Sequence, residues 1–267
     1  VFQKDAYEDQ IDRAAENIRN ADCVIIGAGA GASTAAGIQY GGKRFTDNFG
    51  EFIEKYGVHY MTDMYAAGFY PYPSEEAKWG YWSKHALMNR FDPPALPLYT
   101  KLYDIVKSKE YFVLTTNVDH QFYKAGFDEK RIFATQGDYG KIQCQKACHS
   151  KTYDAKELFR KMDEARKDCL IPSELVPKCP VCGGNMAMNL RCDNYFVEDE
   201  AWHEAADRYA DFLEQNKDKK VVLLELGVGF NTPIIIRFPF EKMVRENSSY
   251  SLIRLNMDEA VVPESFG

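Results

Sequence analysis

Two patterns of apolar residues alternate along this chain of 267 residues. Helical spacing predicts helices over residues of about 4–20, 98–106 and 202–213, where apolar side chains recur every three or four positions. Short apolar runs predict buried strands at 23–26, 111–115, 131–134, 221–226 and 252–255. Because strands that alternate with helices form parallel sheets, we expect an α/β fold, with a Rossmann-like sheet covered by helices on both faces.

Residues 41–95 interrupt this alternation with thirteen aromatic side chains and little clean periodicity. Two interpretations are compatible: a set of packed helices, and a cover over a ligand cleft. Residues 138–195 carry cysteines and read as loop-rich. We therefore divide the chain into a nucleotide-binding domain, 1–137 with 196–267 and the insertion 41–95, and a small module, 138–195.

Composition narrows the possible partners. The chain is 45% apolar, enough for one large core or a core with a satellite module, and its net charge is −7. An acidic chain lacks the basic face that nucleic acid needs, and no run of 18 apolar residues predicts a membrane span. Seven cysteines, an odd number, favour metal over disulfides in a reducing, cytoplasmic setting. The chain stops at Phe266-Gly267, just after a predicted strand, and we expect a further tail there.

A glycine-rich loop follows the first predicted strand. The pattern Gly27-x-Gly29-x-x-Ala32 is typical of dinucleotide sites, because glycine lets backbone N–H groups approach a diphosphate at a helix start. The same turn also joins a strand to a helix in proteins that bind no nucleotide. Asp47 and Glu51 lie where an acid would hold a ribose, but no strand precedes them. Hydride-transfer dehydrogenases are therefore disfavoured.

Four cysteines form two close pairs, Cys144-x3-Cys148 and Cys179-x2-Cys182, separated by 30 residues. Two such turns together complete a tetrahedral thiolate site, which predicts a structural zinc ion with no open position. The alternatives are four free buried thiols, or His149 as a competing ligand.

Polar residues also follow the later strands. Asn117 and Asp119 come just past the 111–115 strand, where ligands of open parallel sheets bind, although an Asn–Asp turn also caps helices. Arg191 lies nine residues beyond Cys182, where the chain should return to the cleft. An arginine there would steady a carboxylate acceptor or a phosphate, unless it is simply solvated.

These motifs, in this order, resemble the sirtuins. The stretch Gly29–Ile38 matches that family almost without a break, and the Asn117-Val118-Asp119 turn and the cysteine pairs match it as well. The resemblance implies NAD as cofactor, with Asn117 near the nicotinamide ribose and Asn256 near the adenosine ribose. It places the cofactor against Gly29, Ala30, Gly31, Ser33, Thr34, Asn117, Asp119, Gln136, Gly227, Gly229 and Asn256. Three segments depart from the family: Gln39–Gly42, Thr116 and Val228-Gly229.

Gln136 stands where the sirtuin base, a histidine, is expected. An amide can hydrogen-bond a ribose but cannot take up a proton, and a lost general base costs roughly 10²–10⁴-fold. Departure of nicotinamide and transfer of ADP-ribose are still feasible. The chain therefore resembles the microbial class M sirtuins, which implies ADP-ribosylation of a protein, with Asn117, Gln136 and Arg191 catalytic. It also implies a lipoylated glycine-cleavage H-like carrier as acceptor and a functional link to a macrodomain hydrolase.

Two other functions stay open on the sequence. One is a lysine deacylase with an atypical base. His120 is a weak candidate, because its position does not match that base, and the positions of His59, His85 and His203 do not match it either. The other is a catalytically silent sensor of NAD or ADP-ribose, which the altered Gln39–Gly42 stretch favours.

Overall fold

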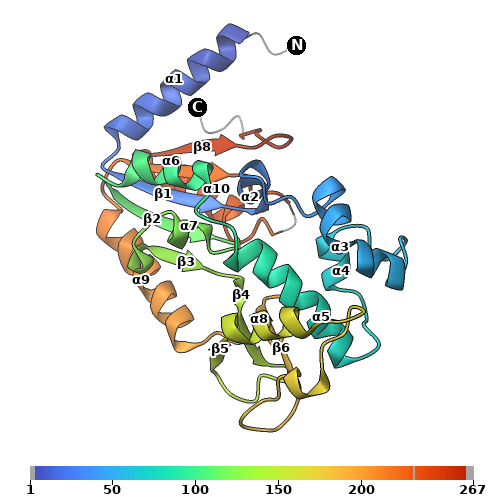
Figure 1. Ribbon diagram of the computed structural model, residues 1–267. Helices are drawn as coiled ribbons and strands as arrows, with labels where there is room; N and C mark the ends of the chain where they lie inside the picture. The colour runs from blue at the N-terminus through green and yellow to red at the C-terminus, as the bar shows by residue number, and fades with distance from the viewer. Residues whose placement is uncertain (1–3, 231, 263–267) are drawn as a thin grey trace.

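The computed structural model describes residues 4–230 and 232–262, and it contains two sheets (Figure 1). The larger sheet has five parallel strands in the order β3-β2-β1-β7-β8. The smaller sheet is antiparallel, in the order β5-β4-β6. The strands are β1 Cys23–Ala28, β2 Glu110–Thr115, β3 Ile132–Ala134, β4 Gly137–Cys144, β5 Thr152–Asp154, β6 Met186–Leu190, β7 Val221–Leu226 and β8 Tyr250–Leu255.

The helices lie on both faces of the larger sheet and around the smaller one (Figure 1). The α-helices are α1 Lys4–Asn20, α2 Ala30–Ala35, α3 Gly42–Tyr56, α4 Met64–Gly68, α5 Glu75–Ala86, α6 Pro97–Val106, α7 Gln121–Lys124, α8 Lys156–Ala165, α9 Glu200–Asn216 and α10 Arg237–Glu246. The described chain also contains three short helical segments of other types. These are the π-helix η1 Leu87–Phe91 and the 3-10 helices η2 Glu129–Arg131 and η3 Ser173–Leu175. No helix in the described part of the chain combines the length and apolar character that crossing a membrane requires.

The alternation of side chains along the central strands creates two cores. On one face, Val24 and Ile26 of β1 pack with residues of α6 such as Tyr99 and Leu102. On the other face, Ile25 packs with residues of α9 and α10. Every residue of β1 is buried, as expected for a strand covered on both sides. The predicted fold class is confirmed.

The aromatic insertion forms a core of its own. Phe45, Phe49 and Phe52 of α3 are fully buried against α4 and α5. Ring contacts such as Phe49–Tyr81, with centroids 5.3 Å apart, tie this cluster to α5. The segment is helical, as the first interpretation of residues 41–95 expects, and Tyr65, Phe69 and Trp82 from it line the cleft described below. That it covers a bound ligand stays a prediction.

The structure adds elements that the apolar pattern did not indicate. Residues 138–195 hold three strands and the helix α8, not only loops, and α7 and α10 were not predicted. α8 presents only Phe159 and Met162 as fully buried side chains, so its periodic signal is short. The predicted helix at 4–20 is confirmed, but Tyr7 and Ile11 are exposed on it. The division of the chain at 138–195 stays a prediction, and the expected C-terminal tail lies outside the described residues.

Candidate active site

A cleft of about 1200 Å³ opens at the carboxyl ends of the parallel strands. Open parallel sheets bind ligands at this edge, because the loops after successive strands converge there. Of the predicted site residues, the cleft is lined by Gly29, Ala30, Gly31, Thr34, Gln136, Arg191, Gly227, Gly229 and Asn256. Its other walls include Met64, Tyr65, Phe69, Trp82, His85, Thr116, Val118 and Tyr139.

Two glycine loops meet backbone to backbone at the floor of this cleft. Gly31 N donates to Gly227 O at 3.0 Å, and Gly29 N donates to Leu226 O at 3.0 Å. A Cβ on Gly31 would lie 2.7 Å from the Cα of Gly227, so a side chain cannot fit between the loops. The sequence suggests glycine here for close approach of a phosphate. The structure adds a second reason, which is the close contact between two loops from non-adjacent segments.

The loop after β7 is held in place by polar side chains from β8 and beyond. Asn256 Nδ2 donates to Val228 O at 3.0 Å, so the predicted cofactor residue also braces the Gly227–Gly229 loop. Beneath it, Arg254 forms a buried ion pair with Glu225, with Nε 2.7 Å from the carboxylate. Such a pair needs both partners, since either charge alone would be costly to bury.

Ser33, Asn117 and Asp119 do not line the cleft but form a hydrogen-bond network directly behind the glycine loop. Ser33 Oγ donates to Asp119, so Tyr99, 2.8 Å away, must donate its hydroxyl proton to Ser33 Oγ. Asn117 Nδ2 lies 3.4 Å from the Tyr99 oxygen and donates to it. Burial raises the pKa of Asp119, and hydrogen bonds from Ser33 and the Gln121 backbone oppose this. The network fixes the turn that carries Asn117.

Gln136 is placed at the cleft by the end of β3, and its Oε1 is buried with no hydrogen-bond partner among the described residues. A buried amide oxygen without a partner costs free energy unless a ligand supplies a donor. Arg191 N donates to Gln136 O at 3.0 Å, so the chain leaving the cysteine module does return to the cleft, beside Gln136. The Arg191 guanidinium is ion-paired with Glu198 and lies 4.3 Å from the Phe196 ring centroid. It is therefore held at the cleft and not simply solvated.

His120 lies outside the residues that line the cleft. Its Nδ1 is 2.9 Å from Asp138, which also pairs with Arg90 at 2.9 Å. The pKa of Asp138 is lowered to about 2, because the hydrogen bond from His120 and the charge of Arg90 outweigh its burial. His120 is thus a partner of this carboxylate, and it does not line the cleft.

The structure brings to the cleft two residues to which the sequence motifs assign no role, His85 and Tyr139, and it places Arg44 and Tyr40 near them. His85 of α5 lines it, and among the histidines of the described residues it alone does so. The sequence carries no motif around His85. Arg44 stands near the segment that departs from the family: its Nη1 donates to Gln39 O at 2.9 Å and to Asn89 Oδ1 at 2.8 Å. Tyr40 and Tyr139 join hydroxyls at 2.8 Å across the same wall.

The four paired cysteines gather at the ends of β4 and β6. Their sulfur atoms all lie within 4.8 Å of one another, with Cys144–Cys182 at 3.7 Å and Cys148–Cys179 at 3.6 Å. A tetrahedral zinc with bonds of about 2.3 Å separates its sulfurs by about 3.8 Å, so the cluster fits structural zinc. His149 Nδ1 is 3.1 Å from Cys148 Sγ and its Nε2 is 2.8 Å from Tyr153 Oη, which places the imidazole beside the four sulfurs.

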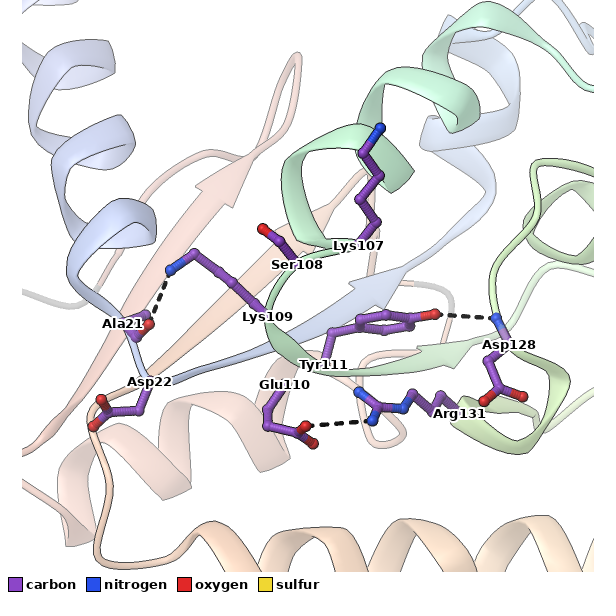
Figure 2. Close-up of a pocket in the computed structure, with 9 residues that line it drawn as sticks. All are labelled: Ala21, Asp22, Lys107, Ser108, Lys109, Glu110, Tyr111, Asp128 and Arg131. Carbon is purple, nitrogen blue, oxygen red and sulfur yellow. Dashed lines mark hydrogen bonds and ion pairs between the residues drawn. The ribbon is translucent and has the colours of Figure 1, made fainter.

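A second hollow of about 640 Å³ lies near the amino ends of β1 and β2, on the opposite edge of the sheet (Figure 2). Its cations already have partners: Arg131 pairs with Glu110 at 3.4 Å, and Lys109 donates to Ala21 O at 3.0 Å. Neither loop glycines nor unpartnered buried groups occur there among the described residues. The cleft at the carboxyl ends is therefore the candidate active site.

Comparison with known proteins agrees with this geometry, although no family model matches the chain. A protein ADP-ribosyltransferase of Staphylococcus aureus (strain Mu50 / ATCC 700699) is 40% identical over 249 residues, which cover 93% of this chain and 78% of the relative. The chain belongs to the sirtuin family, within its protein ADP-ribosyltransferase branch. A probable bifunctional ADP-ribose hydrolase/ADP-ribosyltransferase of Fusarium oxysporum f. sp. cubense is 32% identical over 94% of the chain, which spans 43% of that relative.

Solved structures show the same fold. A complex of a Sir2 homologue with NAD superposes with a TM-score of 0.55 at 15% identity, covering 93% of this chain and 83% of that one. At this identity the likeness shows the sirtuin fold alone. Within that fold, this sirtuin presents Gln136 to the cleft and braces the Gly227–Gly229 loop with backbone contacts and Asn256.

Proposed function

We propose that this chain is an NAD-dependent protein mono-ADP-ribosyltransferase that releases nicotinamide and modifies a protein acceptor. The observation that carries the proposal is the cleft at Gln136, an amide with a buried, unpartnered oxygen where proton transfer would need a base. His85 does not replace the base, because burial lowers its pKa to about 3. Membership of the ADP-ribosyltransferase branch supports the same activity.

The order of the strands indicates how the dinucleotide lies. Gly29 follows the middle strand β1, Gly227 and Asn256 follow β7 and β8, and Asn117 and Gln136 follow β2 and β3. A diphosphate at the two glycine loops therefore leaves one nucleoside over β7 and β8 and the other over β2 and β3. We assign the adenosine to the first side, beside Asn256. The nicotinamide ribose then lies beside Asn117 and Gln136, with Ala30, Ser33, Thr34, Asp119 and Gly229 supporting the loops.

The reaction breaks the bond between the ribose C1′ and the pyridinium nitrogen, and nicotinamide leaves with the electron pair. C1′ becomes oxocarbenium-like, and the acceptor atom forms the new bond to it. Gln136 Oε1 would accept a hydrogen bond from a ribose hydroxyl and so orient the sugar without removing a proton. A carboxylate acceptor attacks in its ionised form and needs no base. Arg191, at the cleft beside Gln136, would steady such an anion after exchange with Glu198.

We further propose that the acceptor is a lipoylated glycine-cleavage H-like carrier. The cleft has an apolar side that suits a long, flexible arm, because Tyr65 and Phe69 line it and are 67% and 55% exposed. A macrodomain hydrolase would reverse the modification; a relative named as both hydrolase and transferase supports that link. The clustered thiols support a reducing, cytoplasmic setting.

One experiment tests the activity and the acceptor together. The zinc-loaded protein is incubated with isotopically labelled NAD and, in separate reactions, with the lipoylated carrier, the unlipoylated carrier or an acyl-lysine peptide, followed by intact-mass spectrometry. We expect one ADP-ribose on the lipoylated carrier and release of nicotinamide. Deacylated peptide with O-acyl-ADP-ribose would indicate a deacylase and refute the proposal, and bound NAD without turnover would indicate a sensor.

The role of Asn117 is tested in the same assay. Asn117→Ala should reduce transfer at least about 100-fold, because the ribose loses a positioning hydrogen bond in the transition state. Thr62→Ala, an exposed threonine outside the cleft lining, serves as the control and should keep full activity. Full activity in the Asn117 variant would remove this residue from the mechanism.

A further inference from the structure

His85 is a buried titratable residue that neither the sequence motifs nor the proposed transfer step uses. It is 1% exposed, yet it lines the cleft together with Trp82 and Tyr139. Its ring centroid lies 4.6 Å from that of Tyr139 and 5.0 Å from that of Trp82. The imidazole therefore belongs to an aromatic wall of the cleft, and its Nε2 has no hydrogen-bond partner among the described residues.

The hydrogen bonds around Tyr81 decide which nitrogen of His85 carries the proton. The Tyr81 hydroxyl has one proton and donates it to Met64 O at 2.6 Å. His85 Nδ1 lies 3.1 Å from the same hydroxyl oxygen, so Nδ1 must be the donor in this contact. In a neutral ring, Nε2 is then an acceptor. Burial and the charge of Arg44 keep the ring neutral by lowering the pKa of His85 to about 3.

The position of this acceptor within the cleft identifies the half of a dinucleotide that it meets. His85 contacts Tyr139, which follows Gln136 by three residues. Tyr139 N donates to Val118 O at 3.0 Å, which ties this part of the wall to the turn after β2. Gly227 and Asn256 follow β7 and β8, which lie on the other side of β1 from β2 and β3. If the proposed function holds, the nicotinamide nucleoside occupies the side of His85.

We propose that His85 Nε2 accepts a hydrogen bond from the carboxamide N–H of the nicotinamide group and so selects the amide form of the dinucleotide. The group that reaches Nε2 must be flat, to fit beside Trp82 and Tyr139, and must offer a donor. A carboxamide on an aromatic ring has both properties. A carboxylate or a methyl ketone at the same place offers no donor, and leaves the buried nitrogen unpaired.

The test compares NAD with a dinucleotide that lacks this donor, and uses two further ligands as references. Affinities of the zinc-loaded protein for NAD, 3-acetylpyridine adenine dinucleotide, nicotinamide hypoxanthine dinucleotide and ADP-ribose are measured by calorimetry without an acceptor. The acetylpyridine compound keeps the carbonyl but has no N–H, and ADP-ribose lacks the nicotinamide group. We expect the protein to bind NAD about 10-fold more tightly than the acetylpyridine analogue, as one neutral hydrogen bond to a buried acceptor predicts.

Three variants locate the effect. His85→Phe should bind NAD and the acetylpyridine analogue within about 2-fold of each other, while its affinity for ADP-ribose stays that of the unaltered protein. His85→Gln, which restores an acceptor oxygen, should recover part of the preference. His59→Phe, an exposed histidine outside the cleft lining, is the matched control and should keep all of it.

The possible failures are distinguishable. If neither NAD nor ADP-ribose binds the unaltered protein, the proposed function itself is wrong. If the unaltered protein binds NAD and the acetylpyridine analogue equally well, only the role of His85 is overturned. The same holds if His85→Phe still prefers NAD over the acetylpyridine analogue. A preference for NAD over the hypoxanthine analogue alone, lost in His85→Phe, would assign His85 to the adenine amino group and likewise refute the proposal. If His85→Phe does not fold, the same pair is measured with His85→Gln, and a preference as large as that of the unaltered protein overturns the role of His85.

Discussion

Replacing Gly227 by alanine should separate the two glycine loops on which the cleft depends. Gly227 has φ of 56°, in the left-handed region that side chains with a Cβ rarely adopt. A Cβ there would lie 2.4 Å from Ala32 N and 2.4 Å from the carbonyl carbon of Gly31. Ordinary contacts of a Cβ begin near 3.4 Å, so the loops must move apart by about 1 Å.

The cost follows from the bonds that this movement breaks. The left-handed conformation alone costs an alanine about 1 kcal/mol. Separation of the loops also weakens two hydrogen bonds of 3.0 Å, from Gly31 N to Gly227 O and from Gly29 N to Leu226 O. Each weakened hydrogen bond lowers the stability by about 1 kcal/mol. We expect Gly227→Ala to lower the free energy of unfolding by about 2–4 kcal/mol and to weaken ADP-ribose binding at least about 10-fold.

Urea unfolding of the zinc-loaded protein, with calorimetric titration of ADP-ribose, measures both effects. Gly50→Ala is the matched control, because Gly50 lies within α3 and a Cβ there meets nothing within 4 Å. Alanine is the better helix former, so this control should be as stable as the unaltered protein or up to about 1 kcal/mol more stable. An unfolding midpoint and an ADP-ribose affinity for Gly227→Ala equal to those of the control would refute the reasoning.

Three other predictions address the metal, the missing base and the buried histidine. The protein should contain one zinc ion per chain, and chelation or Cys179→Ser should unfold the module around β4 and β6; an unchanged melting transition after zinc removal would contradict the structural role. The rate of transfer should be flat between about pH 6 and 8, because Gln136 does not titrate and His85 stays neutral; a rise with a midpoint near 6.5 would reveal an unrecognised base. The folded pKa of His85, about 3, lies below its unfolded value of 6.5, so the unfolded state binds more protons and stability falls as the pH drops below 6.5. Between pH 6.5 and 5 this group should remove about 2 kcal/mol, measured as a shallower pH dependence of unfolding in His85→Phe; equal slopes would show that the ring is already charged.

Local patterns in the sequence determined much of the fold. Continuous apolar runs identified the central strands β1 and β7, because a strand buried on both faces has apolar residues at successive positions. The short spacing within each cysteine pair indicated the metal cluster, since two sulfurs from one turn are close whatever the rest of the chain does. Gln136 was identifiable only through the motif around it and the resemblance to a family. The chemical role of Gln136 still depends on which residues surround it in the cleft, and the sequence does not show this.

Tertiary structure alone decided which side chains share the cleft. His85 comes from an aromatic helix without a motif, and contacts with Tyr81 and Tyr139, 4 and 54 residues away, set its tautomer and position. The glycines at 31 and 227 have to be glycine because two loops almost 200 residues apart in sequence touch through their backbones. A local sequence pattern reflects the secondary structure and burial of residues that are adjacent in the chain. Hydrogen bonds between distant segments leave no such pattern, and those bonds determine the chemistry of this cleft.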